Sequence, residues 1–369
     1  MEFVGDGYEA LALMAVQPAE IVVSDLRMPG MNGVELLSEV RQRYPQTIRL
    51  IHSGDADSQL VFSSAGCAHQ FLSKPCEAEL IDRTLARVAR VQESLGNHQL
   101  RALLSRMERL PSVPAVYGAM MEALRHPGTT IADLGTIIAR DPAMTVQMLK
   151  LTNSAFFGLR YEVVDPVEAL SFLGIDLVKS LLLMAHAMSH GEKHSLPQGL
   201  MERVWQHSLE TAAIARAIAK SEGADLNTTN AAAVAGMLHD VGKLILASNL
   251  GGEYRKVLET TGQGRVGLIE AESDAFGATH ADVGGHLLEL WGLPVAVVEA
   301  IALHHVPARG AIRGFTPLVA VHVANGLAYA RHPAASGRPS ASWDIDWLSG
   351  LGFDARLKAW KELHLADLE

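Results

Sequence analysis

Cysteine is scarce in this chain of 369 residues, which contains only Cys67 and Cys76. Two thiols cannot form the disulfide framework of a small secreted protein, so we expect a reducing, cytoplasmic location. The first residues do not form the basic segment that opens a signal peptide. The most apolar stretches, such as residues 180–187, fall far short of the ~20 residues that span a bilayer, so no membrane association is expected.

Positive charge is also in deficit, since the formal net charge is -10 at pH 7. An acidic chain has no general attraction to nucleic acid or to anionic membranes. Because no recognisable reading-helix motif occurs either, we do not expect DNA as a partner. The hydrophobic fraction of 49% indicates a globular protein, and the length indicates two or three domains.

The first eighty residues contain three short apolar segments, at 21–25, 48–54 and 70–73, each of which is followed by or ends in a polar side chain. A segment with helical spacing, residues 34–44, separates the first two. Strands that alternate with helices indicate a doubly wound parallel sheet, in which functional groups collect at the carboxyl ends of the strands. The residues expected at these ends are Asp25, Ser53 and Lys74.

The run S-D-L-R-M-P-G-M-N-G around Asp25 makes residues 1–83 resemble the receiver domain of response regulators. This resemblance implies that Asp25 is the phosphoacceptor and that a sensor histidine kinase is a partner. It also implies that Ser53 binds the phosphoryl group, that Lys74 pairs with its charge and that Phe71 is the aromatic switch. A carboxylate nucleophile with a nearby cation suits phosphoryl transfer. The alternative is that Asp25 only caps the end of a strand.

The segment departs from the receiver pattern at its start. Residues 2–7 match the second strand of the family, so the first strand and the acidic pair that holds Mg²⁺ are missing. Asp6 does not replace that pair, because it lies in the turn after the wrong strand. A complete receiver would bind Mg²⁺, but most of that site is missing here. Either the true start lies upstream, which we favour, or the receiver cannot be phosphorylated normally.

Residues 84–107 carry apolar side chains at helical spacing, which indicates a connecting helix. It is either a signalling helix that pairs with a second copy in a homodimer or a linker helix that lies on the next domain. Fewer than three clean heptads are visible, so the spacing does not decide between them.

Helical periodicity dominates from residue 108 to 330, and this region resembles the HDOD domain, the HD-related output domain. We expect a multidomain fold: an α/β doubly wound receiver-like segment without its first strand, followed by an all-α HD-type output domain. The output domain divides into residues 108–198 and an HD-like part at 199–330, before a tail at 331–369. The matching segments are Leu110–Pro114, Asp141–Thr145, Leu151–Ala155 and Ser171–Gly174.

Histidine carries the main chemical signal of the output region, because imidazole and carboxylate groups are good ligands for Zn, Mn or Fe. His239-Asp240 resembles the signature doublet of HD-superfamily phosphohydrolases, and Lys243 is placed to hold a phosphate charge. The candidate ligands, which resemble the dinuclear pattern of cyclic-dinucleotide phosphodiesterases, are His207, His239, Asp240, His280, His304 and His305. A metal-free polar network of the same residues is the equally weighted alternative.

Two departures weigh against catalysis. Asn325 stands where a final metal-binding Asp is expected, and an amide is a weak or lost ligand. Residues 306–310 also lack the G-Y-P motif of the phosphodiesterase branch. HDOD domains are regarded as acting through protein contacts, so our first hypothesis is a non-catalytic response regulator that binds a downstream signalling protein. The alternatives are a metal-dependent phosphohydrolase acting on a cyclic dinucleotide or other nucleotide, and a sensor that binds a nucleotide without cleaving it.

Overall fold

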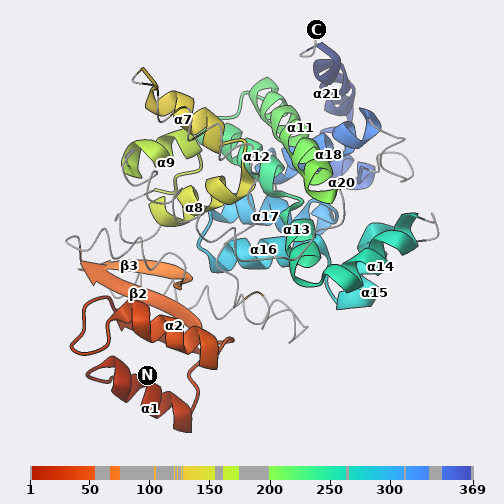
Figure 1. The fold of residues 1–369 in the computed structure, drawn as a ribbon. Helices are drawn as coiled ribbons and strands as arrows, with labels where there is room; N and C mark the ends of the chain where they lie inside the picture. Colours follow the sequence, from red (N-terminus) through yellow and green to blue (C-terminus); the bar gives the residue numbers. More distant parts are fainter. Residues whose placement is uncertain are drawn as a thin grey trace.

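The computed structural model contains a small α/β part followed by a larger helical part (Figure 1). It describes residues 2–54, 67–74, 128–153, 161–173, 199–262, 266–310, 313–331 and 343–366, and the single positions 104, 120, 123 and 126. The expected connector and many residues of the expected 108–198 part lie outside these ranges. Helices α1 and α21, near the two ends of the chain, lie on opposite sides of the molecule.

The α/β part is built on three parallel strands in the order β1-β2-β3. They are β1 (Ile21–Asp25), β2 (Ile48–Gly54) and β3 (Gln70–Lys74). Asp25 pairs with His52 of β2, and Gly54 pairs with Lys74 of β3. The expected parallel arrangement is therefore confirmed, and the polar strand ends meet at one edge of the sheet.

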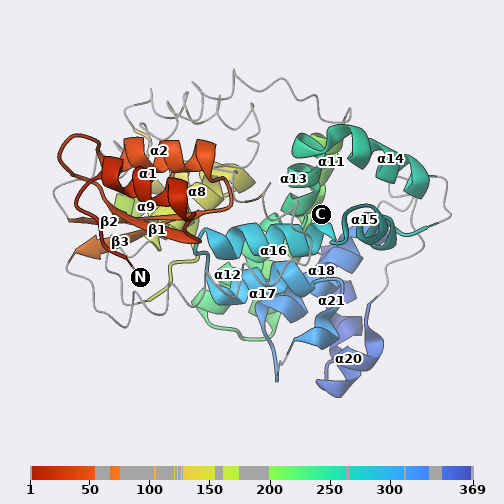
Figure 2. The same ribbon diagram turned by 90° about the horizontal axis from the view of Figure 1, so that it is seen from below.

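Helices α1 (Gly7–Val16) and α2 (Gly33–Arg43) lie on the same side of this sheet (Figure 2). Asn32 begins α2 with a capping box, in which its side chain accepts from the Glu35 N–H and Glu35 accepts from the Asn32 N–H. The apolar face of α2 packs on β1 and β2, and α1 packs on α2. Helix α2 thus covers the sheet directly, and α1 packs on α2.

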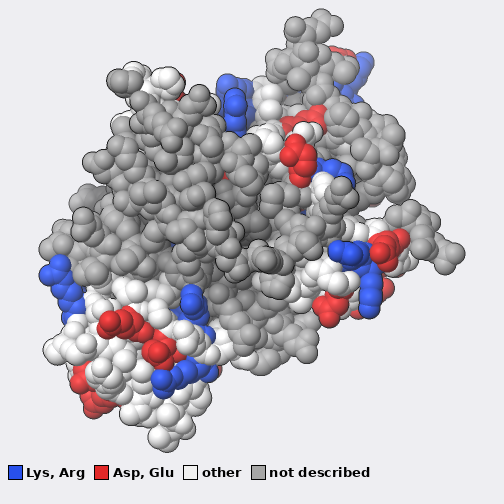
Figure 3. Space-filling view, in the orientation of Figure 1, with Lys and Arg blue, Asp and Glu red and all other residues white. Residues whose placement is uncertain are grey.

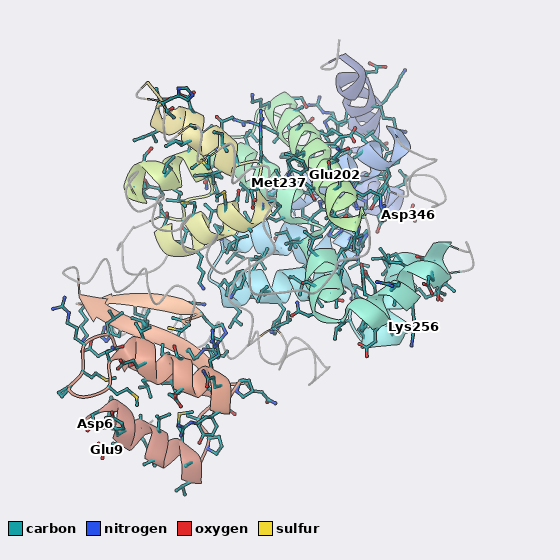
Figure 4. The ribbon with its side chains drawn as sticks, in the orientation of Figure 1. Asp6, Glu9, Glu202, Met237, Lys256 and Asp346 are labelled. Carbon is teal, nitrogen blue, oxygen red and sulfur yellow. The ribbon has the colours of Figure 1, made fainter. Side chains whose placement is uncertain are left out.

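Residues 2–4 were expected to form a strand, and this expectation is wrong, because they lie outside any strand. The described sheet has the order β1-β2-β3, and no strand in it pairs with residues 2–4, so they have no partner strand there. Without that partner the segment has no ladder to join, and Phe3 is 85% exposed. Asp6 instead caps α1 by accepting a hydrogen bond of 2.9 Å from the Glu9 N–H, and both side chains lie at the periphery (Figure 4).

The helical part contains most of the chain. The helices among its described residues are α7 (Ile131–Ile138), α8 (Pro142–Thr152), α9 (Pro166–Leu173), α11 (Leu200–Ser221), α12 (Leu226–Leu238), α13 (Val241–Asn249), α14 (Gly251–Gly262), α15 (Leu268–Phe276), α16 (His280–Leu290), α17 (Val295–Leu303), the 3-10 helix η4 (Pro307–Arg309), α18 (Pro317–Arg331), α20 (Ile345–Gly350) and α21 (Asp354–Ala366). Helix α12 is central, because α11, α17 and α18 all pack against it. The C-terminal α21 contacts α11 and α18, and Trp360 is buried there.

The stretch Leu226–Asn249 is long and apolar enough to cross a membrane by length and composition, a feature that the sequence reading missed. In the fold, 89% of its most apolar window is buried among the other helices. The core helix of a soluble protein passes the same test. Small residues let this core pack closely: a Cβ added at Gly236 would lie 2.8 Å from the Ala212 Cα of α11.

The two parts are in direct contact through β3 and the turn before it. The Lys150 ammonium of α8 donates a hydrogen bond of 2.9 Å to the Ala68 carbonyl and lies 5.1 Å from the centre of a Trp291 ring. The Gln70 side-chain amide donates a bond of 2.9 Å to the Leu290 carbonyl at the end of α16. Residues of both parts therefore share one apolar core.

Charged side chains are mixed on the face drawn in Figure 3. Acidic and basic groups lie side by side over the α/β part and over the region of α14 and α15. The described residues of this face therefore do not gather charge of one sign into a large patch.

Lys150 gives a test of this interface. Burial lowers the pKa of Lys150 to about 7, with the Cys67 thiol and the Arg49 guanidinium as its titratable neighbours. The unfolded chain holds this proton up to a pKa of about 10.4, so its contribution to the free energy of unfolding rises with pH between those two values. In the wild type this effect raises the free energy of unfolding by ~2 kcal/mol between pH 7 and pH 9. Lys150→Met should abolish this rise, as measured by chemical denaturation at the two pH values.

Lys256 on α14 is exposed, so Lys256→Met is the matched control. Its free energy of unfolding should keep the wild-type pH dependence. An unchanged slope in Lys150→Met would contradict the burial of this ammonium at the interface.

Candidate functional site

The His239-Asp240 doublet lies at the break between two core helices. His239 ends α12 and Asp240 begins α13, with only 0% and 1% of their surfaces exposed. Figure 4 shows Met237, two residues before the doublet, deep in the helical part. A Cβ added at Gly242 would lie 1.9 Å from the His280 carbonyl oxygen, so glycine is required there. This close approach of α13 and α16 places Asp240 beside His280.

Three buried histidines present the same nitrogen to Asp240. The Nδ1 atoms of His239 and His304 lie 2.7 Å from the carbonyls of Gly236 and Ile301, one turn earlier in their own helices. A carbonyl only accepts, so Nδ1 carries the proton and Nε2 keeps its lone pair. The His280 Nδ1 similarly faces a Glu272 carboxylate oxygen at 2.7 Å.

The Nε2 atoms converge on the two oxygens of the Asp240 carboxylate. His280 Nε2 lies 3.1 Å and His304 Nε2 3.9 Å from Asp240 Oδ1, while His239 Nε2 lies 3.5 Å from Oδ2. His305, at the end of α17, places its Nε2 3.1 Å from that of His280. These five of the six residues that the sequence analysis selected come from the junction of α12 and α13, the start of α16 and the end of α17.

The sixth residue, His207 of α11, lies 3.9 Å from Asp240 Oδ2 but has a partner of its own. Its Nε2 forms a bond of 2.9 Å with Asn325 Oδ1 of α18. Lys243 forms a short ion pair with Asp240 Oδ2, and its ammonium lies 3.2 Å from the Tyr329 hydroxyl. Lys243, which was predicted to contact a phosphate, is therefore paired with Asp240 in this structure.

Burial and charge act in opposite directions on these groups. Burial lowers the pKa of His239 to about 3 and holds the pKa of His304 and His305 well below its usual value. Burial alone would raise the pKa of Asp240, but His239 and the Lys243 ammonium hold it well below the usual range. His239, His304 and His305 are therefore neutral imidazoles beside an ionised carboxylate, the protonation states that metal ligands need. His280 differs: burial would lower its pKa, but the Glu272 carboxylate raises it.

Sequence reasoning missed Glu272 of α15, which is fully buried. Its carboxylate accepts from the His280 N–H at 2.8 Å, from His280 Nδ1 at 2.7 Å and from the Tyr254 hydroxyl at 2.8 Å. Although burial would raise the pKa of Glu272, His280 lowers it. The only signal in the sequence is an acid eight residues before His280. A carboxylate behind a ligand histidine fixes the ring's orientation and raises its basicity.

Metal binding fits the residues present. His239 Nε2, His304 Nε2 and Asp240 Oδ1 are buried without a hydrogen-bond partner, which is costly unless a ligand satisfies them. Two groups of ligand atoms each lie within 4.8 Å of one another: Asp240, His280, His304 and His305, and His207, His239 and Asp240. Both share the Asp240 carboxylate.

The receiver residues form a second, simpler site at the sheet edge. Asp25 Oδ2 lies 2.6 Å from the Lys74 ammonium, and Asp25 Oδ1 accepts from the Leu26 N–H at 2.8 Å. Ser53 and Phe71 lie in β2 and β3, but their side chains are outside the described part. Among the described residues, both groups of three or more potential ligands lie in the helical part, and Asp25 belongs to neither.

Glu272→Gln should lower the free energy of unfolding by ~2–3 kcal/mol, because an amide –NH₂ would face the donors that the carboxylate now accepts from. The exposed Glu270→Gln in the same helix should change it by less than ~0.5 kcal/mol. Chemical denaturation of the two variants measures the difference. Equal effects would mean that Glu272 does not hold His280.

Comparison with known proteins agrees with this architecture. The HDOD domain family matches residues 110–307, and the response regulator receiver domain family matches residues 1–86. The MmoQ response regulator from Methylococcus capsulatus has a similar fold, with a TM-score of 0.51 and 24% identity over 68% of this chain and 97% of that one. A virulence factor from Campylobacter jejuni gives a TM-score of 0.54 with 17% identity, over 74% of this chain and 95% of that one.

Curated relatives match parts of the chain. An uncharacterized protein of Treponema pallidum is 24% identical over 61% of this chain and 44% of its own length. The hydrogenase transcriptional regulatory protein HoxA of Cupriavidus necator is 36% identical over 25% of this chain and 20% of its own length. The chain thus spans less than half the length of these relatives. The HDOD match covers more than half of this chain. The chain therefore belongs to the HDOD family, and it joins that domain to a receiver domain, as a signal-transduction response regulator does.

Proposed function

We propose that the receiver segment controls the HDOD part through their direct contact, and that the HDOD part in turn binds a downstream signalling protein. A sensor histidine kinase acts on Asp25 in this proposal. The observation that carries it is the packing of β3 and its preceding turn on α8 and α16 through Lys150 and Gln70.

The proposed route runs along two elements, β3 and α16. Lys74 at the end of β3 pairs with Asp25, and Gln70 at the start of β3 binds the Leu290 carbonyl at the end of α16. The opposite end of α16 is His280, beside Asp240. A change of charge at Asp25 can therefore shift β3 against α16 and alter the balance between two packed arrangements of the output part.

Hydrogen–deuterium exchange tests this coupling. Lys74→Ala removes the ion pair and should make peptides of α8 and α16 exchange ~2- to 5-fold faster, which corresponds to ~0.5–1 kcal/mol of local opening. Arg43→Ala, which removes an exposed ion pair with Glu39 on α2, is the control and should leave these peptides unchanged. Changes confined to residues 2–74 would contradict control of the output part by the receiver.

A metal-dependent phosphohydrolase is the second candidate, because the three buried, partnerless ligand atoms suit a metal ion. Asp240 and the histidines around it would hold it, and Glu272 would orient His280. When bound, such an ion supplies Lewis-acid polarisation of a phosphoryl oxygen. Lys243 would have to leave Asp240 to contact a phosphate of the substrate.

Turnover separates the two candidates. A phosphohydrolase should cleave cyclic dinucleotides or other nucleotides when Mn²⁺ or Fe²⁺ is added, and His239→Ala should abolish this activity, as followed by chromatography of the products. The regulator that acts by protein contact should show no turnover. Saturable nucleotide binding without product would instead indicate a sensor.

A further inference from the structure

The two oxygens of the Asp240 carboxylate face different surroundings, although both adjoin histidines. Oδ1 is buried without a hydrogen-bond partner. Oδ2 already pairs with the Lys243 ammonium. The two groups of potential ligands that share Asp240 are therefore not equivalent.

The Oδ1 side has the dimensions of a single metal site. Its closest ligand pairs, His280 Nε2 to Asp240 Oδ1 and His280 Nε2 to His305 Nε2, are both 3.1 Å apart. Ligands held ~2.0–2.1 Å from a tetrahedral zinc ion lie about 3.3 Å from one another. The His304 Nε2, which lacks a partner, completes the set at 3.9 Å from Oδ1.

The Oδ2 side is already filled by the chain's own groups. The Lys243 ammonium, itself held near the Tyr329 hydroxyl, occupies the position of a cation against this oxygen. The His207 Nε2 is engaged by Asn325 Oδ1 at 2.9 Å, and since an amide oxygen only accepts, this nitrogen carries a proton. His239 is thus the one histidine of this group whose Nε2 remains without a partner.

We propose that the site holds one zinc ion on the Oδ1 side, bound by Asp240, His280, His304 and His305, and that Lys243 takes the place of a second cation. This inference rests on the metal-holding property proposed above and specifies its stoichiometry. Four protein ligands complete a tetrahedral shell, whereas catalytic zinc sites keep an open position. The bound ion would therefore tie α13, α16 and α17 together and favour an output part that acts by contact.

The geometry also gives Asn325 a role of its own. Its amide oxygen keeps the His207 ring protonated at Nε2, where a carboxylate would offer a further ligand. Changing Asn325 to Asp and removing the Lys243 charge should together open the second side. The double variant Lys243→Gln/Asn325→Asp therefore tests the inference by gain of a site, which a merely unfolded variant could not mimic.

The experiment is calorimetric titration of the chelator-treated full chain with Zn²⁺, with zinc per chain counted by elemental mass spectrometry. We expect one ion in the wild type and in His207→Ala, at least ~10-fold weaker binding in His305→Ala, and two ions in the double variant. Circular dichroism checks that the variants are folded, and the visible spectrum of the Co²⁺-loaded wild type should be that of a four-coordinate ion.

Each other outcome contradicts the inference in a distinguishable way. Two ions in the wild type, or equal losses in His207→Ala and His305→Ala, would overturn the single-ion site but leave metal binding intact. If the double variant still holds one ion, Lys243 does not take the place of a second cation. No zinc in the folded wild type would contradict the metal-holding property itself.

Discussion

The buried carboxylate of Asp240 is the constraint on which the helical part depends. An ionised carboxylate that is 1% exposed is stable only when other groups compensate its charge. Lys243 supplies one positive charge directly at Oδ2, and His280 and His304, from the ends of α16 and α17, lie beside the remaining oxygen Oδ1. The packing that brings these groups together depends above all on the close contact of Gly242 in α13 with α16. This packing therefore stabilises the buried charge of Asp240 as well as burying apolar side chains.

The same packing links the site to the receiver segment. Helix α16 begins with His280 at the carboxylate and ends at Leu290, whose carbonyl binds Gln70 of β3. A single helix of eleven residues thus contacts Asp240 at one end and β3 of the receiver segment at the other. The His280 end of this helix is held by Glu272, alone or together with a metal ion. This restraint also limits how far the Leu290 end can move together with β3.

Local patterns in the sequence were enough to predict strands β1, β2 and β3 and to select the His239-Asp240 doublet. The segments ending near Asp25, Ser53 and Lys74 form a parallel sheet, because short apolar runs bounded by turns carry that information locally.

Contacts between distant residues were not predictable in this way. Glu272 carries no motif, Lys150 reads as an ordinary helix residue, and Asn325 was read only as a weak ligand, not as the partner of His207. Residues 2–4 failed as a strand because pairing depends on a neighbour, which their own pattern does not reveal.

Anomalous X-ray diffraction at the zinc edge, on crystals of the zinc-loaded chain, tests the central claim most directly. The account predicts one peak, bounded by Asp240 Oδ1 and the Nε2 atoms of His280, His304 and His305, with Lys243 still paired to Oδ2. A peak on the Oδ2 side between His207 and His239, with Lys243 displaced, would contradict it.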